Sequence, residues 1–254
     1  MFFQFWQSSF WRFLSLHAPP TTVVSEEKAK VVIAPNLANT NNLLKTMPLT
    51  SSDNKLLSPF VGPVIGSCIA SFVQEHGVKL IIKRERITKA GDYTHPHPGQ
   101  PFHKITVNGN LNQYAFFITF IHEVAHLRTW NINKGRVLPH GKEWKREYYM
   151  LLKDINCALY FPQDICEVLS YHMEHIKSSS AYDIALMKVL KKYDQNSEKG
   201  HTVGDLLPNA KFLYKDRHFV RGEKLRTRIK CQCISDKRIY LFHQMATVEA
   251  ISNL

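Results

Sequence analysis

The chain has 254 residues, of which 44% are hydrophobic and 21% are charged, as is typical of a globular protein with its own core. Lysine and arginine number 33 against 21 acidic residues, and the resulting net charge of +12 favours polyanionic partners such as nucleic acid. The absence of a run of roughly 18 apolar residues argues against a membrane span, and five irregularly spaced cysteines argue against a disulfide scaffold. We therefore expect a soluble protein of the reducing cytoplasm.

The first 52 residues carry no consistent secondary-structure signal. The aromatic N-terminal stretch is interrupted by polar residues such as Gln4 and Arg12, which argues against a signal peptide. From Ala18 onward Pro, Thr, Ser and Asn dominate without a period. We expect residues 1–52 to be a disordered leader. The alternative is that this leader is mis-annotated and that translation starts at Met47.

The next part of the chain predicts helices and strands of one compact domain. Helical spacing of apolar residues predicts a helix over 59–75, which Gly77 ends. Strands are expected over 78–87 and 103–108, with a Gly/His/Pro-rich loop between them. Residues 111–130 are apolar on nearly every side, which is typical of a helix buried within a domain.

Further helices and then strands complete the predicted α+β fold. We expect helices over 142–156, 163–178 and 182–193, with His172 and His175 on a solvated helix face. We predict two domains. The first covers residues 53–195, and in it the buried helix packs on a small sheet; the second, residues 196–254, is a small basic antiparallel β module.

One strand of the β module, residues 225–233, has a basic face. Arg226, Arg228 and Lys230 alternate with residues that we expect to face inward. Neighbouring cations and aromatic residues suit single-stranded nucleic acid, through phosphate contacts and base stacking, although ordinary β-sheet chemistry gives the same composition. We name these three basic residues as candidate nucleic-acid contacts.

Two histidines and a glutamate stand out in the buried helix. His122 and His126 are four residues apart, so a helix directs both imidazoles to nearly the same side, where they can share one ion. Glu123 follows His122 directly, and in helices of the HExxH pattern this carboxylate takes a proton from water beside the metal. The pattern indicates zinc-dependent peptide hydrolysis, since a metal compensates ionisable groups buried among apolar residues. The alternative is a helix with incidental His and Glu.

A catalytic zinc site needs a third protein ligand and an open fourth position. Glu143 and Glu147 lie at separations that a HExxH-plus-Glu enzyme uses. His140 lies between Pro139 and Gly141, which predict a tight turn that could direct its ring toward the ion. The residues alone leave the choice among these three open.

At this point the sequence resembles a known family. The segments FITFIHEVAHLRTW and PHGKEWKREYYMLL are similar to the SprT-like family, which includes bacterial SprT proteins and the Spartan protease that degrades DNA–protein crosslinks. There the HExxH pattern is followed by a His-Gly pair and an aromatic residue, which match His140, Gly141 and Trp144. RERITKAGDY and HKITVN resemble the strand pair before the family's catalytic helix, so the likeness covers residues 59–178.

The resemblance implies a minimal zincin-like fold with one catalytic Zn²⁺. It implies that His122, His126 and His140 hold the ion, with Glu123 as the catalytic base. It also implies that Gly141 and Trp144 support the site, and that the substrates are proteins bound or crosslinked to DNA.

The C-terminal end departs from the family pattern. SprT proteins commonly carry paired CxxC motifs of a zinc ribbon, whereas this chain has only Cys231 and Cys233 there, so a four-thiolate site cannot form. These two cysteines could hold a second metal with His218 or His243, but we favour small core residues that face inward.

The sequence therefore predicts a cytoplasmic zinc metalloendopeptidase that acts on protein substrates. DNA is a candidate partner, a membrane is not, and the sequence leaves the oligomeric state open. The alternative is a non-catalytic, zinc-stabilised nucleic-acid-binding or regulatory protein. Glu123 argues against this alternative, because a purely structural site does not need a carboxylate that is not a ligand.

Overall fold

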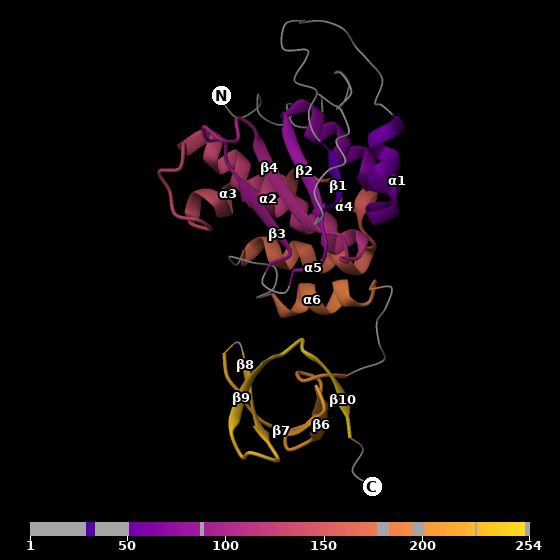
Figure 1. Ribbon diagram of the computed structural model, residues 1–254, viewed down its shortest axis with the longest axis vertical. Helices are drawn as coiled ribbons and strands as arrows, with labels where there is room; N and C mark the ends of the chain where they lie inside the picture. Colours follow the sequence, from indigo (N-terminus) through magenta and orange to yellow (C-terminus); the bar gives the residue numbers. More distant parts are fainter. Residues whose placement is uncertain are drawn as a thin grey trace, which may run out of the picture. The chain divides into compact units, whose positions relative to one another are not determined.

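The computed structural model describes residues 29–33, 51–86, 89–176, 183–194, 201–226 and 228–251. The chain is a mixed α+β protein with two small sheets, so the predicted α+β class is confirmed. It forms two compact units, Met1–Ser178 and Ser179–Leu254 (Figure 1).

The first unit is built on a four-stranded sheet. Its strands are β1 (Ala29–Ile33), β2 (Val78–Lys83), β3 (Gly91–Thr94) and β4 (His103–Asn108), in the spatial order β1-β2-β4-β3. Strands β2 and β4 are parallel, and each outer strand is antiparallel to its neighbour. The central strands are largely buried: four aliphatic residues of β2 and, in β4, Ile105, Thr106, Val107 and Asn108.

Two of these strands correct the sequence-based prediction. Strand β1 lies within residues 1–52, which we expected to be disordered, yet it pairs with β2 and buries Ile33. The other leader residues before Ser51 lie outside the described part of the chain. Strand β3 lies within the predicted loop. Both strands are short. Strand β1 pairs with a strand that is distant in sequence, and the sequence of β3 shows no strand period.

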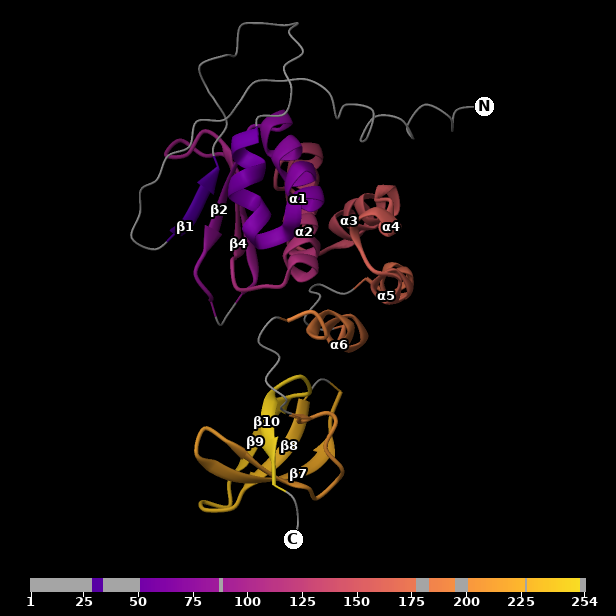
Figure 2. The same ribbon diagram turned by 90° about the vertical axis from the view of Figure 1, so that its right-hand side faces the viewer.

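Helix α1 (Ser51–Glu75) and helix α2 (Gln113–Asn133) cover one face of this sheet (Figure 2). Helix α1 begins before the predicted residue 59 and is broken at Gly62, whose φ of 73° is not helical. By length and composition alone its segment Asp53–Glu75 is apolar enough to cross a membrane. In the structure it packs as a core helix, with its apolar face buried.

Helix α2 is the buried helix that the sequence predicts. It starts because the Asn112 side chain accepts hydrogen bonds from the backbone N–H groups of Tyr114 and Ala115, at 3.1 and 2.9 Å. It ends where Lys134 and Gly135 adopt left-handed conformations. Buried residues occur all round it, so its side chains are held in place by the core.

Three more helices follow in the first unit: α3 (Lys142–Asp154), α4 (Cys157–Tyr160) and α5 (Gln163–Glu174). Helix α3 packs against α2. A disulfide joins Cys157 to Cys166, with their Cα atoms 5.8 Å apart. The irregular cysteine spacing did not predict this pair; Cys68, Cys231 and Cys233 are free.

The second unit contains α6 (Ile184–Lys191) and a six-stranded sheet. The strands, in the spatial order β5-β10-β6-β7-β8-β9, are β5 (His201–Thr202), β6 (Lys211–Tyr214), β7 (Arg217–Lys224), β8 (Arg228–Cys233), β9 (Ile239–His243) and β10 (Thr247–Ala250). The structure places α6 with this sheet, so the units divide at Ser178 and not at the expected residue 195. Lys188 and Lys191 of α6 bond to Asp205 and Thr247, at 2.6 and 2.9 Å.

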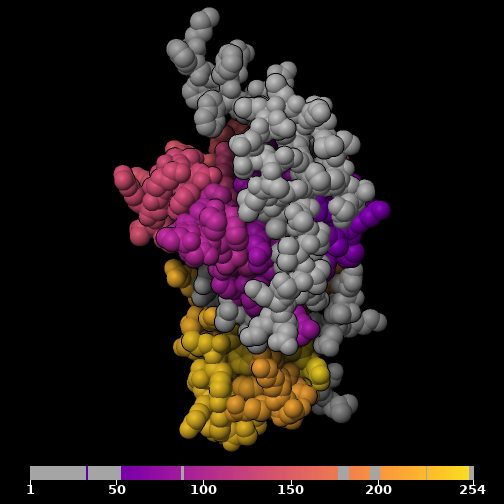
Figure 3. Space-filling model, turned by 45° about the horizontal axis from the view of Figure 1, so that its top comes forward, coloured from indigo at the N-terminus to yellow at the C-terminus, as the bar shows by residue number. Residues whose placement is uncertain are grey.

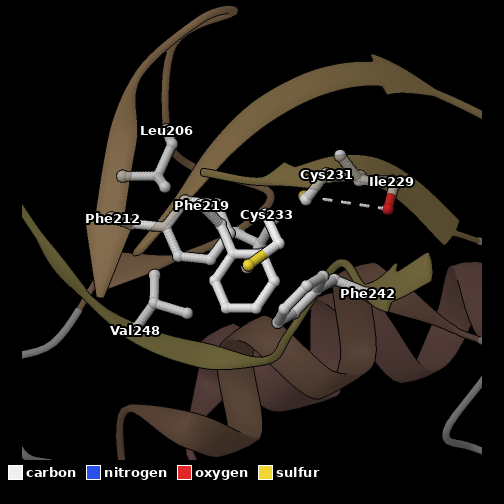
Figure 4. Packing of buried hydrophobic residues seen from close by; sticks show 9 residues of the cluster. Leu206, Phe212, Phe219, Ile229, Cys231, Cys233, Phe242 and Val248 are labelled. Carbon is white, nitrogen blue, oxygen red and sulfur yellow. Dashed lines mark hydrogen bonds between the residues drawn. The ribbon is translucent and has the colours of Figure 1, made fainter. Parts of the chain in front are cut away.

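The sheet of the second unit curves around a core of its own (Figure 4). Three phenylalanines belong to that core beside aliphatic residues and two cysteines, and Phe212 and Phe219 are almost fully buried. Cys231 and Cys233 are also fully buried, which confirms that they face inward. The aromatic residues that suggested base stacking thus pack largely against one another.

Candidate metal centre

Three histidine side chains converge beside helix α2. His122 and His126 lie one turn apart on this helix, and His140 approaches from the loop before α3. The Nε2 atom of His140 is 3.1 Å from that of His122 and 3.0 Å from that of His126. All three side chains are half-buried, so solvent reaches the site. This is the one cluster of possible metal ligands among the described residues, and it brings together the three predicted ligands.

The geometry of the three nitrogens fits a shared metal ion. A neutral imidazole Nε2 carries either one proton or one lone pair, so the His140 nitrogen cannot form two ordinary hydrogen bonds. Zinc binds histidine nitrogen at about 2.0–2.1 Å, which in a tetrahedral site separates two ligand nitrogens by about 3.3–3.4 Å. The observed separations are close to this value.

The three imidazoles are held in the neutral form that a metal requires. Burial is the main cause: it lowers the pKa of His122 to about 3 and that of His126 to about 4. The neighbouring histidines lower both values further. Burial also lowers the pKa of His140. At neutral pH each ring therefore has a lone pair for a cation.

His140 owes its position to a tight turn. The backbone N–H of Gly141 bonds to the Leu138 carbonyl at 3.0 Å, and Pro139 and His140 are the two central residues. His140 has a φ of 57°, which a type II turn requires at this position and which glycine usually supplies. A Cβ on Gly141 would lie 3.0 Å from the Leu138 carbonyl oxygen, so the turn favours glycine at position 141. The pink segment that includes α3, the helix after this turn, lies at the surface (Figure 3).

Trp144 forms the floor of the site. It is fully buried, and its ring centre lies 4.6, 5.3 and 4.7 Å from those of His122, His126 and His140. Tyr148 stacks beneath it at 4.9 Å. Trp144 thus packs against all three rings, as its predicted supporting role requires.

A buried histidine supports this floor from α5. His172 is fully buried and its ring meets that of Tyr148 edge to face at 6.0 Å. This corrects our expectation that His172 lies on a solvated face, which holds for His175 alone. The helical period of α5 places Ile165, Leu169 and His172 on one buried stripe, and the polar imidazole concealed this pattern.

Glu123 lies on a different side of α2 from the histidine pair and is 5% exposed. Burial, with a smaller contribution from Asp92, raises the pKa of its carboxyl to about 8, whereas Arg86 and Lys89 act in the opposite direction. Among the described residues no ion pair of Glu123 is found. A bound dication would favour the carboxylate, which fits a group that accepts a proton beside a metal.

Strand β3 lies very close to Glu123, and the sequence analysis missed this. A Cβ atom on Gly91 would be 2.5 Å from Glu123 Oε1 and 2.6 Å from Thr119 Cγ2. Glycine is therefore needed for the close approach of strand and helix. Two residues on, the Tyr93 ring lies parallel to the His126 ring, with centres 6.4 Å apart. The likeness of RERITKAGDY to a family strand was the one sign of this strand, because Gly91–Thr94 has no strand period of its own.

The two rival ligands are not part of the metal cluster. Glu147 is buried and its carboxylate pairs with Arg128 of α2 at 3.1 Å and with Arg146 at 3.3 Å. Glu143 lies in the first turn of α3, 3.9 Å from the amino group of Lys142. Glu147 thus joins α2 to α3 and does not approach the histidines.

The predicted nucleic-acid residues lie on the surface of the second unit. Arg226 precedes β8, and Arg228 and Lys230 point outward from it, opposite His243 and Leu241 of β9. Lys230 pairs with Glu223. The basic outer face is thus present, although the aromatic side chains of the sheet are on the other side.

Comparison with known families found no family model that matches the chain, and comparison with curated proteins and with solved structures found no similar protein. The resemblance to the SprT-like family thus rests on the motifs alone.

Proposed function

We propose that the chain is a zinc-dependent metalloendopeptidase of the SprT-like type with a zincin-like catalytic unit. The observation that carries the proposal is the convergence of the His122, His126 and His140 Nε2 atoms, two of them from the helix that also buries Glu123. A structural zinc site is normally closed by four protein ligands, whereas among the described residues this cluster has three, and their side chains are partly exposed to solvent.

Each residue of the site has a separate role in the proposed peptide hydrolysis. The three histidines would hold Zn²⁺, and the bound ion would supply Lewis-acid activation of water and of a peptide carbonyl. The Glu123 carboxylate accepts a proton from the attacking water and delivers it to the leaving amine. Trp144 fixes the orientation of all three imidazoles. Gly91 allows β3 to approach Glu123 and to exclude bulk water from one side of its carboxylate.

DNA-bound or DNA-crosslinked proteins are the proposed substrates. The net charge of +12 supports this, because a basic protein concentrates near polyanions. The exposed residues Arg226 and Arg228 and the partly exposed Lys230 are candidate contacts. Phosphate contact would make binding weaken steeply with salt, and salt-insensitive DNA binding by the full chain would count against these contacts.

The proposal is tested by Glu123→Gln. This variant should retain one zinc per chain, because Glu123 is not a ligand, and should lose cleavage of casein and of histone bound to DNA by about 100-fold or more. The control is Glu143→Gln, which removes a nearby carboxylate outside the metal cluster and should leave cleavage unchanged. If wild type and Glu123→Gln are equally inert while both bind zinc, the chain is instead a non-catalytic zinc protein.

A further inference from the structure

Strand β9 lies at one end of the second unit's sheet. Among the described residues its one strand partner is β8, in antiparallel register from Arg228 opposite His243 to Gln232 opposite Ile239. The end strand of a sheet offers unpaired backbone groups to another chain, and proteins commonly guard such strands with charge, proline or a bulge. Between Ile239 and His243 there is neither a proline nor an ionised carboxylate or ammonium group.

The alternation of backbone hydrogen bonds between β8 and β9 identifies the β9 residues whose N–H and C=O groups face the open edge. The N–H of Cys233 bonds to the carbonyl of Arg238 at 2.9 Å, and Lys237 at φ 59° forms the turn before it. Hydrogen-bonded pairs alternate with non-hydrogen-bonded pairs along an antiparallel ladder. Counting from Arg238, the N–H and C=O groups of Ile239 and Leu241 therefore point away from β8.

The same two residues expose their side chains. Ile239 is 57% and Leu241 is 56% exposed, whereas Phe242 between Leu241 and His243 is buried in the core. Leu241 lies opposite Lys230, and Ile239 lies opposite Gln232. Two large aliphatic side chains thus stand side by side on the surface, at the edge where backbone groups are open. Single exposed aliphatic residues are common, but a pair on an open strand edge is typical of a docking site.

The surroundings of this edge are basic. Arg228 on β8 and Lys237 and Arg238 in the turn before β9 are exposed, and no ion pair of these three with a described residue is found. Lys230 is already paired with Glu223. A partner with acidic side chains would therefore find unpaired cations at the start of β9 and one strand away from it.

The structure favours a protein segment over single-stranded nucleic acid as the occupant. Nucleic-acid strands are held by bases stacked on exposed aromatic rings, and Phe212, Phe219 and Phe242 are buried in the core. The exposed side chains of the edge are aliphatic, which suits contact with other aliphatic residues. A second copy of the chain is disfavoured, because pairing of two β9 edges would bring like charges together.

We propose that β9 is a docking edge for an extended protein segment that carries aliphatic residues flanked by aspartate or glutamate. The segment adds to the sheet as a further strand, with its backbone bonded to Ile239 and Leu241 and its acidic residues near Arg228, Lys237 and Arg238. This inference stands independently of the proposed peptidase activity.

The test uses the full chain carrying Glu123→Gln and a fluorescent heptapeptide, DEVIVED, followed by fluorescence anisotropy. The comparison peptides are KKVIVKK, which reverses the charge, and DEVPVED, whose proline removes a backbone donor and disrupts strand pairing. We expect DEVIVED to bind and both comparison peptides to bind at least tenfold more weakly. Leu241→Lys should weaken binding of DEVIVED at least tenfold, since a lysine guards the edge, and Arg228→Glu should weaken it severalfold.

The matched control is Leu207→Lys, which changes another aliphatic residue of the same unit that is 77% exposed, and it should leave binding unchanged. The proposal is overturned if DEVIVED does not bind, or if Leu241→Lys and Leu207→Lys have the same effect. It is also overturned if a labelled oligothymidylate binds in place of the peptide and loses affinity in Leu241→Lys. The same holds if sedimentation shows a dimer that Leu241→Lys converts to a monomer.

Discussion

His140 occupies a backbone conformation that is costly for any residue with a Cβ atom. Its φ of 57° is left-handed, and the turn tolerates it because His140 brings the third imidazole to the pair on α2. Strain of this kind is found at functional sites, where the surrounding structure holds it in place. The sequence suggested a tight turn at Pro139 to Gly141 but not the left-handed histidine within it.

The strain at His140 predicts different stabilities for two variants that both lose the ligand. His140→Gly and His140→Ala should each reduce zinc content well below one per chain. In the presence of a chelator, His140→Gly should be more stable than His140→Ala by about 1 kcal/mol, because glycine adopts positive φ at no steric cost. Urea unfolding of the two metal-free variants measures the difference. Equal stabilities would contradict a left-handed His140.

The close packing at Gly91 predicts that an added methyl group lowers both stability and activity. Gly91→Ala places a Cβ 2.5 Å from Glu123 Oε1 and should lower the free energy of unfolding by about 1–3 kcal/mol, with loss of activity. Gly99→Ala is the control, because its Cβ would meet no atom closer than 3.5 Å, the Cε1 atom of His97. Thermal unfolding and casein cleavage are the measurements. If both variants behave like wild type, β3 does not lie against Glu123.

At the scale of the elements, Glu147 joins helices α2 and α3. Glu147→Gln removes the charge that faces Arg128, at 3.1 Å, and should lower the free energy of unfolding by about 2 kcal/mol. Zinc content should stay at one per chain, in contrast to His140→Ala. Denaturant unfolding and metal analysis of the purified variant measure both. A loss of zinc greater than that of His140→Ala would return Glu147 to the ligand set.

The disulfide between α4 and α5 predicts the number of accessible thiols. Denatured protein that has not been reduced should show three free thiols, and reduced protein should show five. Reduction should also lower the free energy of unfolding by about 2.5 kcal/mol, from the loop entropy of a link across nine residues. Five thiols without reduction would mean that the pair is open in solution, as the predicted cytoplasmic location would favour.

Helices and strands with a strong local sequence pattern could be predicted, and those without one could not. Helix α2 was predicted because it is long and apolar, and the strand over 78–87, observed as β2, because of the alternation at Leu80 and Ile82. Strands β1 and β3 were missed because pairing with β2 and β4, and not their own sequences, stabilises them. The metal ligands on α2 followed from helical spacing, whereas the choice of His140 over Glu147 required family resemblance, since no local pattern shows that Glu147 pairs with Arg128.

At the scale of the whole molecule, the chain divides into a unit that carries the metal cluster and a unit that carries an open strand edge. Helix α6 belongs with the second unit because Asp183 caps it and its lysines bond to Asp205 and Thr247. A periodicity analysis cannot assign a helix to a domain, since the assignment depends on contacts that are distant in sequence. In the second unit the sequence predicted the basic face, and the structure adds that Phe212, Phe219 and Phe242 are buried in the core.

The central claim is that one zinc ion is held by His122, His126 and His140, and X-ray absorption spectroscopy of the zinc-loaded full chain tests it most directly. We predict one zinc per chain with three imidazole nitrogens at about 2.0–2.1 Å and no sulfur ligand. A shell of sulfur at about 2.3 Å would place the metal on cysteines instead, and would contradict the account. So would a zinc content that His140→Ala leaves unchanged.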